Sequence, residues 1–146
     1  MSGVLLIVLN EGFDDMSLLA CQVILEENGN DVIISSKVNG TIKGDDSSVI
    51  TVSLEEALNQ GEDYKGIIVI GGNDLNGWSL LDECITKMHG EKKIIGGVEK
   101  GVEIISKNIA DIPLSNSSDI VNEGNVITLL NPENVENFAE ELVKLV

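Results

Sequence analysis

Short runs of Val, Ile and Leu alternate along the chain with longer segments in which apolar residues recur at helical spacing. A short apolar run bounded by turn residues is typical of a buried strand, and a 3.6-residue repeat is typical of an amphipathic helix. Strands joined by helices pair in parallel, because the helix returns the chain to the starting edge of the sheet. The alternation therefore predicts an α/β domain with a mostly parallel sheet.

The strand pattern occurs at Val4–Leu9, Asp31–Ser35, Gly66–Ile70, Ile94–Val98 and Val126–Leu129, with a Gly-rich antiparallel excursion over 40–53. The apolar stripes of the expected helices span Met16–Ile24, Leu54–Leu58, Leu80–Met88, Val102–Ile105 and Val135–Leu145. Residues 108–124 are polar and are expected to be irregular. The last helix is expected to begin at Asn131 as N-cap, with Pro132 at the first helical position.

The composition agrees with one domain of this class. The 146 residues are 42% hydrophobic and 3% aromatic, so the core must consist mainly of Val, Ile and Leu. We expect residues 1–146 to form a single three-layer domain, with helices on both sides of a doubly wound, flavodoxin-like sheet. In such sheets, sites lie at the carboxyl ends of the strands.

The charge of the chain excludes two classes of partner. Its 25 acidic residues against nine Lys and Arg give a formal net charge of −16. Nucleic acids and anionic membranes attract clustered positive charge, so we expect neither as a partner. The first apolar run, 3–9, is too short to span a bilayer and no basic region precedes it, so a cytoplasmic protein is expected. The acidic excess indicates either solubility or an acid-rich or salt-rich setting, or else a docking face for a basic partner.

The chain holds two cysteines, Cys21 and Cys84, and one histidine, His89. No C-x-x-C spacing and no histidine cluster is present, so we expect no metal and no cofactor. Both cysteines lie within apolar helical patterns, which are typical of buried, inert thiols. Cys21 lies one helical turn after Ser17, but we expect no catalytic role for it.

Loops at the strand ends are the candidates for a site, namely Asn10–Ser17, Gly71–Gly77 and Glu99–Gly101. The first loop is acidic where a flavodoxin would hold the phosphate of its flavin, so phosphate binding is excluded. A receiver domain would need an aspartate at the position of Gly71 and Gly72, so that interpretation fails as well.

Glu99 stands at the turn from a buried strand into a helix. A residue at such a turn projects its side chain over the sheet edge, as a nucleophile elbow does, yet an acid there is also explained by the helix macrodipole. Gly71 and Gly72 either form a cradle of outward-pointing amides or only end a strand. Asp14 and Asp15 are expected as helix-start acids that could join Glu99 around an adventitious cation.

Segments along nearly the whole chain resemble the ThiJ/PfpI superfamily, which includes the parkinsonism-associated deglycase, PfpI-type proteins and glyoxalase-like relatives. VLLIVLNEGFDDMSLLACQVILEENGNDVIISS is similar to the opening strand, E-G-F-E-E-x-E loop and first helix of that family. YKGIIVIGGND is similar to its D-A-L-V-L-P-G-G turn, KIIGGVEKGVEII to its A-A-I-C-H-G-P elbow, and GNVITLLNPENVENFAEELVKLV to its G-N-L-I-T-S-R-G-P-G-T ending. The resemblance implies a class I glutamine amidotransferase-like fold and a homodimer.

The resemblance places Glu99 where the family has its reactive cysteine and Lys100 where many members have histidine. Ser17 falls where the family carries a glutamate that contacts the cysteine, while the pair Gly71–Gly72 is retained. A hydroxyl that faces a carboxylate again provides one donor and one acid. We predict that Ser17 donates a hydrogen bond to Glu99, which the glycine turn and the helix N-terminus also stabilise.

Two functional hypotheses follow. In the first, the chain is a catalytically degenerate pseudoenzyme that binds a small ligand or a partner protein at the elbow, because thiol chemistry requires an activated thiolate. In the second, Glu99 is the general base or nucleophile of a hydrolase or lyase that acts on a small carbonyl compound. Burial of Glu99 favours the first hypothesis, and partial exposure with a raised pKa favours the second. The candidate pocket consists of Ser17, Gly71, Gly72, Glu99, Lys100 and Gly101.

Overall fold

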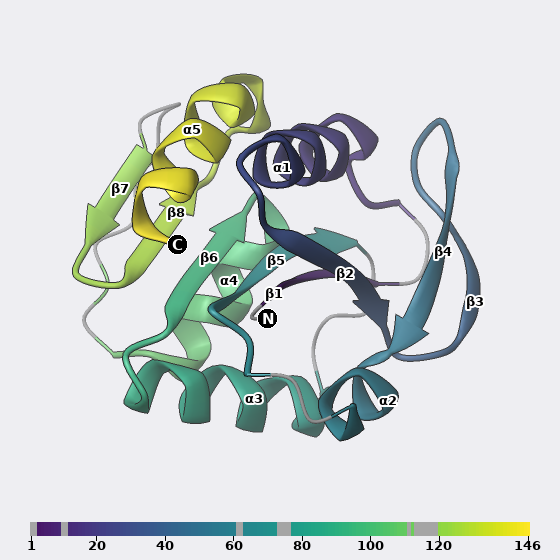
Figure 1. The fold of residues 1–146 in the computed structure, drawn as a ribbon, viewed down its shortest axis with the longest axis horizontal. Helices are drawn as coiled ribbons and strands as arrows, with labels where there is room; N and C mark the ends of the chain where they lie inside the picture. Colours follow the sequence, from purple (N-terminus) through teal and green to yellow (C-terminus); the bar gives the residue numbers. More distant parts are fainter. Residues whose placement is uncertain (1–2, 10–11, 61–62, 73–76, 111, 113–119) are drawn as a thin grey trace.

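The computed structural model describes residues 3–9, 12–60, 63–72, 77–110, 112 and 120–146. Within these residues an eight-stranded sheet has the order β3-β4-β2-β1-β5-β6-β8-β7 (Figure 1). The strands are β1 (Gly3–Leu9), β2 (Asp31–Ser36), β3 (Gly40–Lys43), β4 (Ser48–Ser53), β5 (Gly66–Gly72), β6 (Ile94–Val98), β7 (Ile120–Glu123) and β8 (Val126–Leu129). In this sheet order, all neighbouring strands from β4 to β8 pair in parallel. The edge strands β3 and β7 pair with their neighbours in the antiparallel direction. The predicted mostly parallel sheet is confirmed.

Helices cover both faces of the sheet and make the predicted three layers (Figure 1). On one face lie α1 (Asp15–Glu27) and α5 (Val135–Leu145), side by side, and the short 3-10 helix η1 (Pro132–Asn134) leads into α5. On the other face lie α2 (Leu54–Asn59), α3 (Ser79–Gly90) and α4 (Lys100–Asn108). Each face buries its own apolar cluster against the sheet.

The central position of β1 explains its unbroken apolar sequence. The side chains of residues 4–8 are fully buried and point alternately to the two faces. Leu5 and Ile7 pack in the cluster under α2, α3 and α4, while Leu6 and Val8 pack in the cluster under α1 and α5. A strand covered on both faces needs apolar residues at every position, which is why the sequence predicts it well.

The expectation that residues 108–124 are irregular is wrong at both ends of that segment. Asn108 belongs to α4, and Ile120–Glu123 form β7, which pairs with β8 in the antiparallel direction. The last two residues of β7 are exposed, so this edge strand lacks the apolar pattern of the buried strands. Residues 111 and 113–119 lie outside the described part of the chain.

The start of the last helix is confirmed in part. The Asn131 side chain accepts a hydrogen bond from the backbone N–H of Glu133 at 3.0 Å, as an N-cap does, and Pro132 occupies the first helical position. The first turn is a 3-10 helix, however, and the α-helix begins only at Val135. Short 3-10 turns are frequent at α-helix N-termini.

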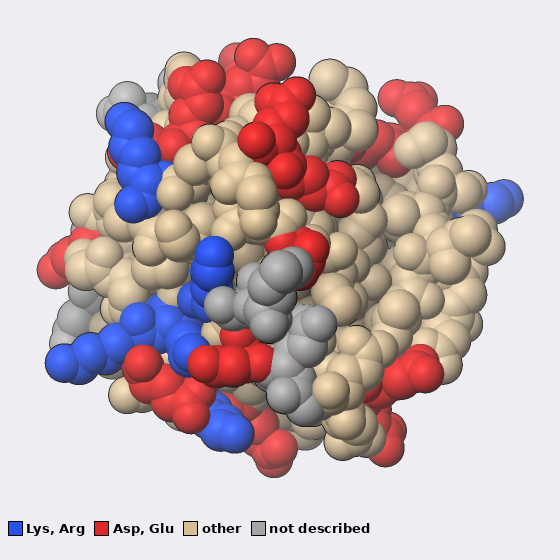
Figure 2. Space-filling view, viewed as in Figure 1, with Lys and Arg blue, Asp and Glu red and all other residues tan. Residues whose placement is uncertain are grey.

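Acidic side chains are spread over the face seen in Figure 2, while several lysines gather at its lower left. A wide uncharged area lies over the β3–β4 hairpin, which carries the exposed side chain of Ile50. In the described part of the chain, no helix has the length and apolar character needed to cross a membrane.

Candidate functional site

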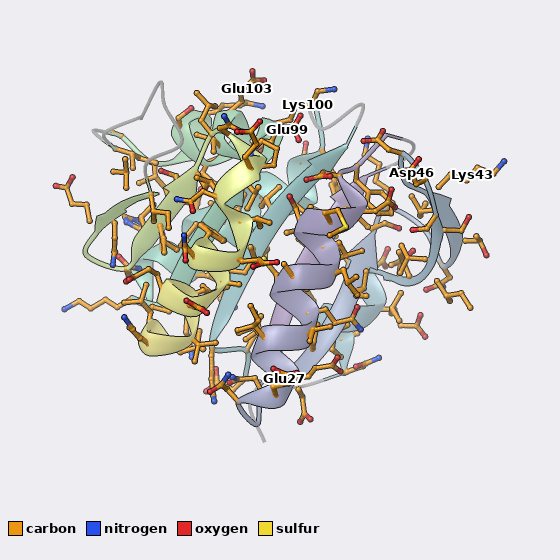
Figure 3. All side chains as sticks on the ribbon, turned by 90° about the horizontal axis from the view of Figure 1, so that it is seen from above. Glu27, Lys43, Asp46, Glu99, Lys100 and Glu103 are labelled. Atoms are coloured by element: carbon orange, nitrogen blue, oxygen red, sulfur yellow. The ribbon has the colours of Figure 1, made fainter. Side chains whose placement is uncertain are left out.

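The candidate loops follow strands that end at the carboxyl edge of the sheet. From β1 the chain builds outward through β2 and β4 on one side, then returns to β5 and builds outward on the other side. The strand order therefore reverses between β1 and β5, and open α/β sheets bind ligands outside the carboxyl end of such a point. Figure 3 shows Glu99 and Lys100 at this edge, whereas Glu27 marks the opposite end of α1.

Glu99 joins β6 to α4 in a backbone conformation that residues with a side chain rarely adopt. Its φ is 54° and its ψ is −116°, which lies outside the left-handed helical region. Conformations of this kind cost on the order of 1–3 kcal/mol and cluster at active sites and ligand sites. The Glu99 N–H donates to the Leu129 carbonyl at 2.8 Å, and its carbonyl accepts from Val102 N–H at 3.1 Å. The predicted strand-to-helix turn is confirmed, and it is strained.

Glycines allow α4 to begin directly against the sheet. A Cβ at Gly101 would overlap the Val69 carbonyl oxygen and lie 2.8 Å from its carbon. A Cβ at Gly97 would lie 3.2 Å from the Gly101 carbonyl. Gly71 approaches from β5, because a Cβ there would lie 3.4 Å from the Gly101 nitrogen and 3.5 Å from Lys100 Cβ. The structure thus brings Gly71 together with the first two residues of α4.

Gly71 and Gly72 belong to the end of β5 and pair with β1, where the sequence predicted that β5 would already have ended. Their φ angles are 113° and 126°, a region that glycine enters without a steric penalty. The register between β1 and β5 shifts between Val69 and Gly71, and such irregularities bend a strand near functional sites. Residues 73–76 of that candidate loop lie outside the described residues.

The carboxyl group of Glu99 is partly exposed, and its surroundings raise its pKa above the usual value for glutamate. Partial burial raises the pKa most, the charges of Asp14 and Asp45 raise it further, and Lys100 lowers it. The side chain makes no capping hydrogen bond to α4. Glu99 therefore retains its proton to a higher pH than a glutamate in water.

Ser17 does not donate to Glu99, so that prediction is wrong. The fully buried Ser17 hydroxyl donates to the carboxylate of Asp14, and a hydroxyl has one proton to donate. Asp14 immediately precedes α1, three residues before Ser17, where a short local hydrogen bond is easily made. Asp14 thus has Ser17 as its partner and acts on Glu99 through its charge.

Asp45 is the site residue that the sequence did not reveal. It lies in the turn between β3 and β4, and its backbone N–H donates to the Phe13 carbonyl at 3.1 Å. In the sequence it belongs to a Gly-Asp-Asp-Ser stretch, which predicts a turn and no functional site. Its proximity to Glu99 depends on tertiary structure that no local pattern records.

Both thiols of the chain are buried, as predicted. The Cys21 side chain has no exposed surface, and burial raises the pKa of its thiol to about 12. Cys84 is 6% exposed, and burial raises the pKa of its thiol to about 11, although Lys87 lowers it. A thiol acts as a nucleophile through its thiolate, so neither side chain is activated for that chemistry.

The acids near the elbow do not form a ready-made metal centre. Among the described residues, no group of three or more His, Cys, Asp or Glu side chains is placed to hold a metal ion. Asp15 is an acid of the first turn of α1, as expected, and its carboxylate bonds to Asp46 and Ser47 of the β3–β4 turn.

No protein-family model matches the sequence, and no curated protein sequence matches it. Solved structures do match its fold. A ThiJ/PfpI domain protein from Brachyspira murdochii is 18% identical, with a TM-score of 0.83 and coverage of 98% of this chain and 95% of that chain. DJ-1beta from Drosophila melanogaster is 18% identical, with a TM-score of 0.84 and coverage of 99% and 91%. A variant of Schizosaccharomyces pombe DJ-1 is 17% identical, with a TM-score of 0.84 and coverage of 100% and 92%. The chain therefore has the fold of the ThiJ/PfpI and DJ-1 proteins.

Proposed function

We propose that the elbow around Glu99 binds a small ligand and that the chain performs no thiol chemistry. The backbone of Glu99 carries this proposal, because a strained conformation persists only where the surrounding structure imposes it, and such conformations cluster at functional sites. The elbow also stands beside the point where the strand order reverses. The burial of both thiols supports the second part of the proposal.

The charges around Glu99 favour a neutral ligand that carries a carbonyl group. Asp14 and Asp45 repel an anion, and they also favour the protonated form of Glu99. A protonated carboxyl can donate a hydrogen bond to a carbonyl oxygen, whereas a carboxylate can only accept. Because Glu99 is only partly exposed, a small molecule reaches it more easily than the surface of a partner protein does.

A second candidate function is acid–base catalysis on a small carbonyl compound. Partial exposure and a raised pKa, the two conditions that favour it, both hold for Glu99. In this role the ionised carboxylate takes a proton from the substrate, and the protonated carboxyl returns one. Lys100, the next residue, supplies positive charge near any negative charge that develops on the carbonyl oxygen.

One set of assays separates these functions. Dihydroxyacetone is titrated into the protein while backbone amide NMR shifts are recorded, and consumption of methylglyoxal is followed separately. We expect shifts at Gly71 and 99–101 that disappear in Glu99→Ala, and no methylglyoxal turnover above that of the Glu99→Ala variant. Glu103→Gln, which changes an exposed acid one turn further along α4, is the matched control and should behave as wild type.

Acid–base catalysis is favoured if the wild-type protein turns over methylglyoxal faster than Glu99→Ala does. This turnover should then also be lost in Glu99→Gln but kept in Cys21→Ala. The same turnover lost in Cys21→Ala and kept in Glu99→Gln would contradict both functions. Absence of both turnover and amide shifts at the elbow would contradict the ligand-binding proposal.

We also propose that the chain forms a homodimer through the outer face of α1. The inner face of this helix buries Leu18, Cys21 and Leu25, yet the outer side exposes 62% of Met16 and 52% of Leu19. A helix that is apolar on both sides is normally buried on both. The resemblance to a dimeric family supports a second copy as the covering partner.

A further inference from the structure

The turn between β3 and β4 is fastened to the segment between β1 and α1 by backbone contacts. Phe13 and Gly44 form an isolated parallel bridge, and the N–H of Asp45 donates to the Phe13 carbonyl at 3.1 Å. The N–H of Gly12 donates to the carbonyl of Lys43 at 3.2 Å. These contacts draw the tip of an edge hairpin to the carboxyl end of the central strand.

The side chain of Asp15 adds two charge-assisted hydrogen bonds to these backbone contacts. One carboxylate oxygen accepts from the backbone N–H of Asp46 at 2.5 Å, and the other accepts from the Ser47 hydroxyl at 2.7 Å. Burial alone would raise the pKa of Asp15, but the hydrogen bonds from Ser47 and Asp46 outweigh it and lower the pKa. Asp15 is therefore held as a carboxylate at neutral pH.

The fit between the two segments is tight. A Cβ at Gly44 would overlap the Asp15 carboxylate and lie 2.7 Å from Cε2 of the buried Phe13 ring. The N–H of Gly44 donates to the Ser47 carbonyl at 2.7 Å, which closes the turn around the Asp15 carboxylate. The turn is thus shaped to receive this one side chain.

The two fastened segments carry the two carboxylates that act on Glu99. Asp14 directly precedes Asp15, and Asp45 directly precedes Asp46, so each carboxylate neighbours one end of the Asp15–Asp46 hydrogen bond. Because that hydrogen bond holds the backbone of the turn, it also holds the position of Asp45 relative to the elbow.

We propose that Asp15 is a positioning residue that keeps the β3–β4 turn, and Asp45 with it, against the elbow of Glu99. The charged groups that act on Glu99 are then Asp14 from the start of α1, Asp45 from the turn and Lys100 from α4. The proposal deepens the proposed function, on which it rests, since it makes the turn the acidic wall of the ligand site.

The test is a titration of the Glu99 side-chain carboxyl by 13C NMR on the ligand-free protein. In Asp15→Ala the titration midpoint of Glu99 should fall, because Asp45 moves away. Ser47→Ala removes one hydrogen bond without a change of charge and should lower the midpoint by a smaller amount. Asp31→Ala, an exposed acid at the start of β2, is the control and should leave the midpoint unchanged.

A double variant identifies the cause. If Asp15 acts through Asp45, then Asp15→Ala should lower the midpoint no further once Asp45→Asn is present. An unchanged midpoint in both Asp15→Ala and Ser47→Ala, with the fold intact by amide NMR, would overturn the proposal, as would full additivity with Asp45→Asn. A midpoint that falls as expected in a protein that binds no dihydroxyacetone would overturn the proposed function alone.

Discussion

Gly101 at the start of α4 lies directly on the Val69 carbonyl of β5, with no room for a side chain between them. This contact lets the helix begin at the sheet surface and sets the height of the elbow above the strand ends. It also predicts the effect of a methyl group. Gly101→Ala should lower the free energy of unfolding by about 1–3 kcal/mol, as measured by urea denaturation. Gly90→Ala is the control, because a Cβ at this last residue of α3 would meet no atom within 4 Å. It should change the free energy of unfolding by less than about 0.5 kcal/mol.

The strain at Glu99 predicts that the site is not optimised for stability. Glu99→Gly should raise the free energy of unfolding by about 1 kcal/mol, because glycine adopts the observed φ of 54° without a steric penalty. The same variant should lose the amide shifts caused by dihydroxyacetone. Lys92→Gly, at the other non-glycine residue with positive φ in the described chain, should keep those shifts. If Glu99→Gly has a lower free energy of unfolding than wild type, the Glu99 backbone is not strained.

The raised pKa of Glu99 predicts a pH-dependent stability. A carboxyl whose pKa is higher in the folded state stabilises the fold below its unfolded pKa, which is about 4.3, and this contribution is lost as the pH rises through the folded pKa. Glu99→Gln has no such loss. Its stability relative to wild type should therefore increase from pH 4 to pH 7 in urea denaturation. A difference that stays constant, or decreases, over this range would refute the assignment.

The exposed apolar stripe of α1 predicts a surface that a single charge can disrupt. Leu19→Glu should convert a dimer to a monomer in sedimentation velocity, because it places a carboxylate in the centre of the stripe formed by Met16, Leu19 and Val23. Leu58→Glu, at a comparably apolar but 37% exposed position of α2, should leave the dimer intact. A wild-type protein that sediments as a monomer would contradict the homodimer.

The parts of the fold that the sequence predicted well are those fixed by burial. β1, β5 and β6 lie between two helical layers, so their apolar residues mark them directly, and the turn that carries Glu99 follows from the end of one such strand. The edge strand β7 has exposed residues and leaves no apolar pattern to detect. Sequence patterns report which side chains avoid water, and an edge strand avoids little of it.

The site was harder to predict, because its electrostatics depend on contacts between distant segments. Asp14 could be seen as a helix-start acid, but its hydrogen bond from Ser17 takes up the hydroxyl proton that was expected to go to Glu99. Asp45 belongs to the β3–β4 turn, which backbone contacts with Phe13 and hydrogen bonds to the Asp15 side chain hold beside the start of α1, some thirty residues away in sequence. A pairing of this range between two short polar segments has no periodic signature.

A crystal structure of the protein grown with dihydroxyacetone would show whether a carbonyl ligand binds at the elbow of Glu99. We expect a Glu99 backbone that keeps its positive φ, with the carbonyl oxygen of dihydroxyacetone at hydrogen-bond distance, about 2.5–3.2 Å, from the Glu99 carboxyl. An elbow that holds no ligand while the compound occupies another surface, or a Glu99 residue with negative φ, would contradict this expectation.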